Sequence, residues 1–184
     1  MIRYFVLLAF LAIGCGDTEE GPSDPPPVQD GYWVNPFDWS DADPDLDPFA
    51  DRRPESWSCP PEAYRAEELA GVWVYSVETQ NCDWLTLTQP TLLPLAAGDR
   101  VQMNVWHFQL IAPEPATALI GLATEAGVLV EVEEPIPSPS RMVQLSFTAT
   151  DPIPAGTDLY FHLNNHGANS WHLVEVLLNP PTDE

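Results

Sequence analysis

The chain contains no lysine and only six arginines against 28 aspartates and glutamates, so its formal net charge is −22. Binding to DNA or RNA depends on clustered Lys and Arg side chains that neutralise phosphates and release counterions. Electrostatic attraction to anionic lipids also needs a basic surface. The composition therefore excludes nucleic acid as a partner, and it excludes adhesion to an anionic membrane by charge alone.

The apolar run at the N-terminus, Tyr4 to Ile13, is too short to cross a bilayer as a helix, which takes about 20 apolar residues. It follows Arg3 and ends at the small residue Gly14. A basic residue, a short apolar stretch and a small residue before the break are the parts of a secretory signal. We therefore expect this run to be removed.

The residues Leu11-Ala12-Ile13-Gly14-Cys15 resemble the lipobox of a bacterial lipoprotein, although this family prefers Leu where Ala12 stands. The resemblance implies a signal peptide over 1–14 and a palmitate-type lipid on Cys15, which becomes the new N-terminus. Two or three acyl chains anchor a protein durably to a membrane. The resemblance thus implies a lipid-anchored protein of the cell envelope. Gly16, the residue after the lipidated cysteine, resembles the sorting signal of outer-membrane lipoproteins. This implies a protein of the outer membrane that faces the periplasm or the cell surface.

Cysteine is scarce, with three in the whole chain. If Cys15 carries the lipid, Cys59 and Cys82 remain as an even pair in an oxidising compartment, which favours a disulfide bond. Such a bond would close a loop of roughly 24 residues and stabilise the fold by about 3 kcal/mol. The alternative is a pair of free thiols.

Residues 15–58 have the composition of a tether, because proline and acidic residues dominate them. The sequence thus divides into a signal peptide, this tether behind the lipidated cysteine, and a folded domain over 59–184. The tether is nevertheless unusually rich in aromatic residues for a disordered segment. Part of 31–58 is therefore expected to pack on the folded domain or on a partner. The aromatic residues are Tyr32, Trp33, Phe37, Trp39, Phe49 and Trp57.

From Cys59 onward the chain consists of short apolar runs separated by Pro, Gly and Asp. Their β-branched and aromatic content and their regular turn signals are typical of an all-β sandwich or barrel. We predict a jelly-roll-like antiparallel sandwich of about eight strands, with one helix over Pro61–Leu69. The expected strands are Gly71–Val77, Trp84–Thr88, Arg100–Leu110, Ala116–Ala123, Val128–Glu133, Met142–Thr150, Asp158–Leu163 and Trp171–Leu178.

The most polar stretch of this domain runs from residue 160 to 172, and it is the predicted ligand-binding site. Strand alternation places Leu159, Phe161 and Leu163 in the core and the intervening side chains on the opposite face. An aromatic ring, an imidazole and amides together suit a polar ring such as a sugar. Turn geometry is the competing explanation for the Asn and Gly residues. The predicted site consists of Tyr160, His162, Asn164, Asn165, His166, Asn169 and Trp171.

A metal site is the alternative, with His162, His166 and His172 offering imidazoles to copper or zinc. The spacing does not favour it, because the first two histidines lie across a strand end and no Cys-x-x-Cys or His-x-His accompanies them. His107 lies in a strand that is apolar on both faces, which predicts a buried histidine rather than a ligand. The main prediction therefore includes no cofactor.

Catalytic patterns are sparse, since the chain has no Gly-x-Ser-x-Gly elbow. Glu131, Glu133 and Glu134 alternate with valines and are predicted to form the solvated face of a strand. We therefore expect no enzyme, but an envelope lipoprotein that binds carbohydrate or another polar ligand. A protein of the envelope is the other expected partner, bound through tryptophans if they are exposed. These are Trp33, Trp39 and Trp57, or Trp73, Trp84 and Trp106.

Overall fold

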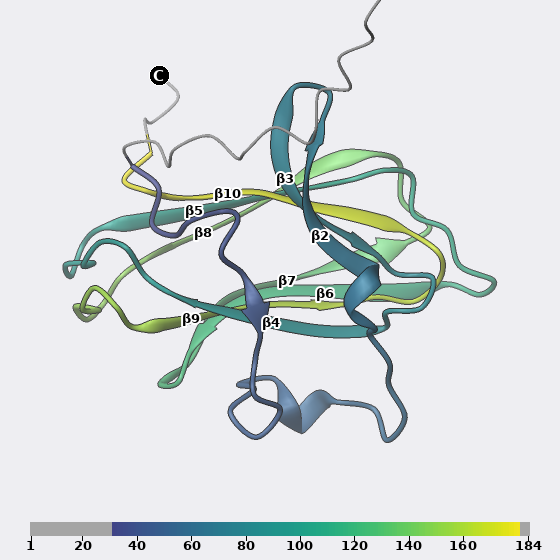
Figure 1. Cartoon of the computed structure of the whole chain (residues 1–184), viewed down its shortest axis with the longest axis horizontal. Coiled ribbons are helices and arrows are strands. Elements are labelled where there is room, and N and C mark those ends of the chain that lie inside the picture. The colour runs from purple at the N-terminus through teal and green to yellow at the C-terminus, as the bar shows by residue number, and fades with distance from the viewer. Residues whose placement is uncertain (1–30, 181–184) are drawn as a thin grey trace, which may run out of the picture.

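The computed structural model describes residues 31–180, which form two antiparallel sheets of five strands packed face to face (Figure 1). The all-β, jelly-roll-like sandwich predicted from the sequence is confirmed. The sheet that lies lower in Figure 1, here called the front sheet, has the spatial order β1 (Ser40–Asp41), β4 (Trp84–Pro90), β9 (Asp158–Asn164), β6 (Ala116–Thr124) and β7 (Gly127–Ile136). The back sheet has the order β2 (Tyr64–Leu69), β3 (Val72–Glu78), β10 (Ser170–Leu178), β5 (Arg100–His107) and β8 (Arg141–Thr148).

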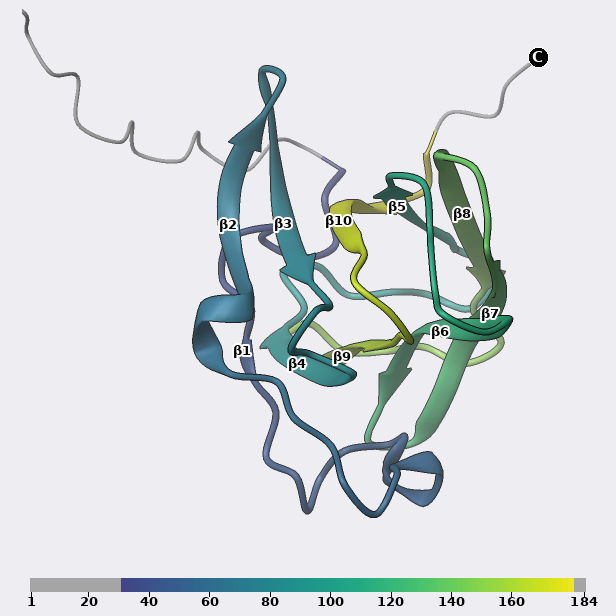
Figure 2. The same cartoon turned by 90° about the vertical axis from the view of Figure 1, so that its right-hand side faces the viewer.

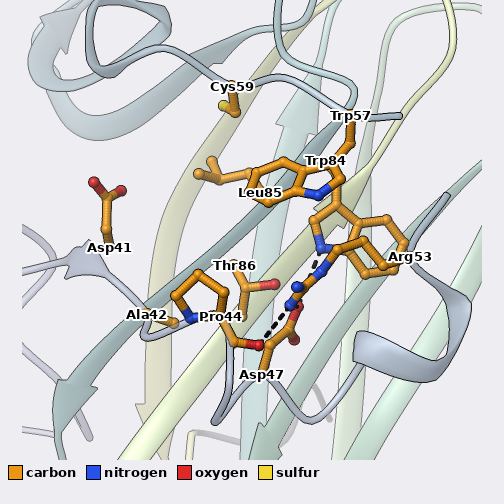
Figure 3. A pocket seen from close by; sticks show the side chains of 10 residues that line it. All are labelled: Asp41, Ala42, Pro44, Asp47, Arg53, Trp57, Cys59, Trp84, Leu85 and Thr86. Atoms are coloured by element: carbon orange, nitrogen blue, oxygen red, sulfur yellow. Dashed lines mark hydrogen bonds and ion pairs between the residues drawn. The ribbon is translucent and has the colours of Figure 1, made fainter. Parts of the chain in front are cut away.

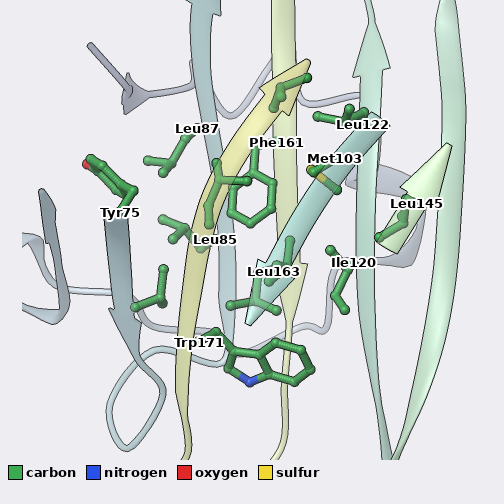
Figure 4. Packing of buried hydrophobic residues seen from close by; sticks show 14 of the residues in the cluster. Tyr75, Leu85, Leu87, Met103, Ile120, Leu122, Leu145, Phe161, Leu163 and Trp171 are labelled. Atoms are coloured by element: carbon green, nitrogen blue, oxygen red, sulfur yellow. The ribbon is translucent and has the colours of Figure 1, made fainter. Parts of the chain in front are cut away.

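The core lies between the sheets and is built by strand alternation. Leu159, Phe161 and Leu163 of β9 are buried in it, as predicted. Figure 4 shows Phe161 and Leu163 meeting side chains of the back sheet, among them Met103 and Trp171. Burying one such side chain stabilises the fold by about 1.5–3 kcal/mol. The core therefore fixes which face of β9 remains available for a site.

The predicted helix over Pro61–Leu69 is wrong. A 3-10 turn, η2, covers Pro61–Ala63, and the chain then continues as β2, which pairs with β3 along its whole length. β2 is the edge of the back sheet, where charged side chains face solvent and discourage edge-to-edge association. The glutamates that suggested a helix thus belong to an exposed strand edge.

Residues 31–58 are part of the folded unit. Trp33, Trp39 and Phe49 are buried, and β1 pairs with β4. The backbone N–H of Trp33 donates to the carbonyl of Val176 over 2.9 Å. These contacts place the segment assigned to the tether against the sandwich, which is the packing that its aromatic content suggested.

The signal peptide and Cys15 lie outside residues 31–180. Within that range, no helix is long and apolar enough to cross a membrane. The predicted disulfide bond between Cys59 and Cys82 is confirmed. It ties the chain just before η2 to the residues just before β4, so it fixes the end of the N-terminal segment against the front sheet.

Candidate binding site

The outer face of the front sheet carries the first predicted site residues, but it is covered by the chain itself. Residues 42–58, here called the cover segment, leave β1, run under the front sheet and return to Cys59 (Figure 2). The segment contains one short 3-10 turn, η1, at Ala50–Arg52. Tyr160 and His162 point to this face and are buried beneath it. The prediction that Tyr160 and His162 lie on the face of β9 opposite to the core is thus correct. The cover segment of the same chain, and not a ligand, packs on that face.

Phe49 is the main contact of the cover segment. Its ring stacks on His162 with centroids 4.3 Å apart and planes at 16°. The indole of Trp84 lies against the same imidazole, also at 4.3 Å. Gly121 provides the space, because a Cβ at this position would lie 2.8 Å from Cζ of Phe49. Burial lowers the pKa of His162 to about 4, against a smaller opposite effect of Asp47.

Asp47 holds the cover segment in place. Its carboxylate accepts hydrogen bonds from Arg53 (2.8 Å), from the indole N–H of Trp84 (3.1 Å) and from the backbone N–H of Phe49 (2.9 Å). Burial alone would raise the pKa of Asp47, but these bonds, with Arg53 foremost, hold it below its ordinary value. The carboxylate therefore stays ionised and joins the segment to β4.

Beside this anchor lies a hollow of about 310 Å³, here called the Trp57 hollow (Figure 3). Trp57 is 43% exposed at the hollow, and the guanidinium of Arg53 lies over its ring at 5.3 Å from the centroid. Most of the wall comes from residues 41–59, and β4 supplies the rest. The lining residues are Asp41, Ala42, Pro44, Asp47, Arg53, Trp57, Cys59, Trp84, Leu85 and Thr86.

The Trp57 hollow combines an apolar plane with charged and hydroxyl groups. Trp57 offers the plane. Arg53 offers the donors that remain beside its bonds to Asp47 and Pro44, and Asp41, which accepts from the hydroxyl of Tyr64 through one oxygen, offers its other oxygen as an acceptor. Its volume lies near the lower end of the ~300–1,000 Å³ that is common for small-molecule sites. It can therefore surround a small ring that has an apolar face and a polar rim.

Two predicted site residues, Asn164 and His166, lie elsewhere on the same face. They line a separate hollow of about 340 Å³ together with Arg52, Glu131 and Glu133. Arg52 forms a two-pronged bridge to Glu131, at 2.8 and 3.1 Å. This hollow is open and polar, and the ion pair already occupies its strongest hydrogen-bonding groups. The predicted site is therefore divided by the cover segment.

The remaining predicted residues, Asn165, Asn169 and Trp171, form a buried hydrogen-bonded network. The indole N–H of Trp171 donates to Oδ1 of Asn165 over 2.9 Å, and Asn169 accepts from the backbone N–H of Ile111 over 2.7 Å. Gly167 has φ +96°, and a Cβ there would lie 2.2 Å from the carbonyl oxygen of Ile111. In this conformation these residues shape the loop and close the end of the sandwich, and they offer no open surface.

The three histidines of the metal alternative are not brought together. His162 lies under the cover segment, and His166 lies on an exposed loop. His172 lies on the back sheet, where its Nδ1 is 2.8 Å from Oγ of Ser76. Across residues 31–180 no group of three His, Cys, Asp or Glu side chains is arranged to hold a metal ion. Strand alternation and the two-sheet division separate residues that are close in sequence, so the predicted copper or zinc cluster does not form there.

His107 is buried, as predicted, with Nδ1 at 2.6 Å from the carbonyl oxygen of Phe108. The expectation for Glu134 is wrong, because this carboxylate is fully buried instead of solvated. Alternation along β7 turns it away from Glu133, and it accepts hydrogen bonds from Arg141 and Ser138. Burial is the largest single effect and raises the pKa of Glu134, but the hydrogen bonds from Arg141 and Ser138 together with the charge of Arg141 outweigh it and lower the pKa overall.

The sequence pointed to Trp57 and Trp84 only as tryptophans that would bind a protein partner if exposed. It missed the polar residues of the Trp57 hollow because they lie in the segment assigned to the tether. Asp41, Asp47, Arg53 and Trp57 stand in a stretch dominated by proline and aspartate. The one available signal was the density of aromatic residues there. It predicted that the segment packs on something, but not which groups it would bring to β4.

No family model matches the chain, and no curated protein matches it. Solved structures with a similar arrangement include TmCBM61 in complex with β-1,4-galactotriose, at 10% identity and TM-score 0.47, covering 82% of this chain and 98% of that one. CsCBM6-3 from Clostridium stercorarium in complex with cellobiose has 11% identity and TM-score 0.39, covering 79% and 95%. The N-terminal cellulose-binding domain of Cellulomonas fimi β-1,4-glucanase C has 16% identity and TM-score 0.40, covering 69% and 94%.

Proposed function

We propose that this protein is a non-catalytic module that binds a hydroxyl-rich ring, a carbohydrate, in the Trp57 hollow. The observation that carries the proposal is the exposed indole of Trp57 at a hollow of about 310 Å³ with charged walls. A sugar ring has an apolar C–H face, which packs on an indole, and a rim of hydroxyls, which need donors and acceptors. Arg53 and Asp41 supply both.

The state of Asp47 supports binding rather than catalysis. A general acid at neutral pH needs a carboxyl whose pKa is raised towards the working pH. The pKa of Asp47 is shifted the other way, and three donors from Arg53, Trp84 and Phe49 occupy the carboxylate. Asp47 therefore supports the walls of the hollow instead of transferring a proton.

The proposal includes anchoring to the cell envelope, at the outer membrane, through a lipid on Cys15. The anchor rests on the lipobox, Leu11 to Cys15, and the assignment to the outer membrane rests on Gly16. Incorporation of labelled palmitate into the full chain, and its loss in Cys15→Ala, is the expected result. Incorporation that persists in the variant, or is absent from the wild type, would contradict the anchor without affecting the proposed binding site.

The binding function is tested by screening the purified chain against polysaccharides and oligosaccharides and measuring the affinity of hits by calorimetry. Trp57→Ala should weaken binding at least tenfold and remove the change in tryptophan fluorescence. Phe108→Ala is the matched control, because Phe108 is 47% exposed and lies outside the hollow. Equal losses in both variants, or no glycan bound by the wild type, would refute the proposal.

A further inference from the structure

The carboxylate of Asp41 is the unbalanced charge of the Trp57 hollow. The other two charged residues of the wall, Asp47 and Arg53, neutralise each other across 2.8 Å. Asp41 accepts a hydrogen bond from the hydroxyl of Tyr64, a neutral group, and it forms no ion pair within residues 31–180. Asp41 is also exposed. The second oxygen of this carboxylate therefore remains open to a ligand.

The segment that forms most of the wall carries more negative charge than it neutralises. Residues 41–58 contain six acidic residues and two arginines, and both arginines already form ion pairs. The pKa of Tyr75 in β3 is raised to about 12, mainly by burial and further by the charge of Asp41. The pKa of Tyr160 is raised by burial and, to a smaller extent, by four neighbouring carboxylates. The surroundings of the hollow are therefore negative and attract a cation.

The charged end and the aromatic end of the hollow are separate. In Figure 3, Asp41 lies on one side of the hollow and Trp57 on the other, with Leu85 of β4 between them. A ligand that packs one ring on the exposed indole can thus extend towards Asp41. The part of the ligand that meets Asp41 gains most if it carries a positive charge, because a charge-assisted hydrogen bond is about twice as strong as a neutral one.

We infer that the ligand of the Trp57 hollow is an amino sugar, a carbohydrate with a protonated amino group, which donates to the free oxygen of Asp41 while a ring packs on Trp57. This inference rests on the proposed function, because it names the class of carbohydrate that the same hollow takes. A hydroxyl group offers Asp41 one donor and no charge, whereas an ammonium group offers three donors and a full positive charge. Sugars that carry a carboxylate are repelled by the same residue.

The first experiment compares β-1,4-linked tetramers of glucosamine and of glucose by calorimetry on the full chain at pH 6. The two ligands differ at carbon 2 of each ring, which carries an ammonium group in the first and a hydroxyl group in the second. The wild type should bind the glucosamine tetramer at least about tenfold more tightly. Asp41→Asn should reduce this preference to about threefold or less, because the amide keeps an oxygen for Tyr64 but has no negative charge.

A cationic tetramer also adheres without a site to a chain of charge −22, so the experiment needs a matched control. Asp45→Asn removes the same charge four residues away, where Asp45 is exposed and lies outside the hollow. This variant should keep the preference of the wild type, whereas Trp57→Ala should weaken binding of the glucosamine tetramer at least about tenfold. Equal losses in Asp41→Asn and Asp45→Asn, or undiminished binding in Trp57→Ala, would show adhesion by net charge and overturn the inference.

The same measurements separate the choice of an amino sugar from the proposed function. If a neutral glycan binds through Trp57 and the glucosamine tetramer binds no more tightly than the glucose tetramer, the inference fails and the proposed function stands. If neither tetramer and no other glycan binds, both fail.

Discussion

The ring of Phe49 stacks on the imidazole of His162 with centroids 4.3 Å apart, and this contact joins the N-terminal segment to the outer face of the front sheet. Both rings are fully or almost fully buried. The contact covers the face of β9 that carries Tyr160 and His162, and it sets one boundary of the Trp57 hollow by positioning Asp47. The stability of this contact and the shape of the candidate site are therefore linked.

Phe49→Ala should lower the free energy of unfolding by about 3 kcal/mol, since it removes a buried aromatic side chain and leaves a cavity. Unfolding in urea, monitored by tryptophan fluorescence, measures this loss of unfolding free energy. Phe108→Ala is the control, and it should change the free energy by about 1 kcal/mol or less, because this side chain is half-exposed and meets Trp106 and His172 through edge-on ring contacts. A loss below about 1 kcal/mol at Phe49 would show that the ring is not packed as described.

The sandwich could be predicted because its signal is local. Alternation in β9 assigned Leu159 and Phe161 to the core and Tyr160 and His162 to the other face, and the structure agrees. Alternation follows from the pleat of a strand and needs no knowledge of the partner. The helix predicted over Pro61–Leu69 was wrong because an edge strand and a short helix can carry the same glutamates. Only the pairing with β3 distinguishes the strand from the helix.

The site could not be predicted in the same way, because its residues meet through long-range packing. Asp47 and Trp84 are 37 positions apart in the sequence, and their hydrogen bond forms only when the cover segment lies on the sheet. Composition predicted a solvated tether there, since prolines and aspartates dominate. The burial of Phe49 depends on the missing side chain at Gly121, which no local pattern connects to it.

Acidification should weaken the docking of the cover segment through His162. Burial lowers the pKa of this imidazole from 6.5 to about 4; Asp47 opposes this shift, whereas Arg52 and Arg53 add to it. The docked state thus binds fewer protons than the undocked state. The contribution of His162 to stability is fully present above pH ~6.5 and is lost progressively as the pH falls towards 4, by at most about 3 kcal/mol.

This pH dependence is measured as the urea unfolding free energy at several pH values between 7.5 and 4.5. His162→Phe, which keeps a ring in the stack, should flatten the profile over that interval. His166→Ala should leave it unchanged, because that side chain is exposed. A wild-type profile as flat as that of His162→Phe would contradict the assignment.

Loss of the disulfide bond between Cys59 and Cys82 should destabilise the chain by about 3 kcal/mol and also release one end of the cover segment. The double variant with serine at both positions should therefore be cleaved faster by trypsin after Arg52 than the wild type in the absence of ligand. The control is cleavage after Arg100, in β5, which is far from the bridge in sequence and lies in the back sheet. Equal acceleration at both sites would indicate global unfolding and would contradict a local role of the bridge in fixing the segment.

The neighbours Arg52 and Arg53 should respond differently to replacement by lysine. Arg53 donates through Nη2 to Asp47 and to the carbonyl of Pro44, and its guanidinium lies over Trp57, so it joins three parts of the wall of the hollow. A lysine keeps the charge but lacks the planar fork and the flat stacking surface. Arg52 bridges to Glu131 at an exposed position outside the hollow.

Arg53→Lys should therefore weaken binding of a glycan at least tenfold and make Trp57 more accessible to the quencher acrylamide, whereas Arg52→Lys should change neither. The two variants carry the same substitution at adjacent positions, so any general effect of lysine on charge or solubility is shared. Calorimetry measures the first effect and fluorescence quenching the second. If the two variants behaved alike, Arg53 would be only a surface charge, and the wall of the hollow would have to be held by Asp47 and Trp84 alone.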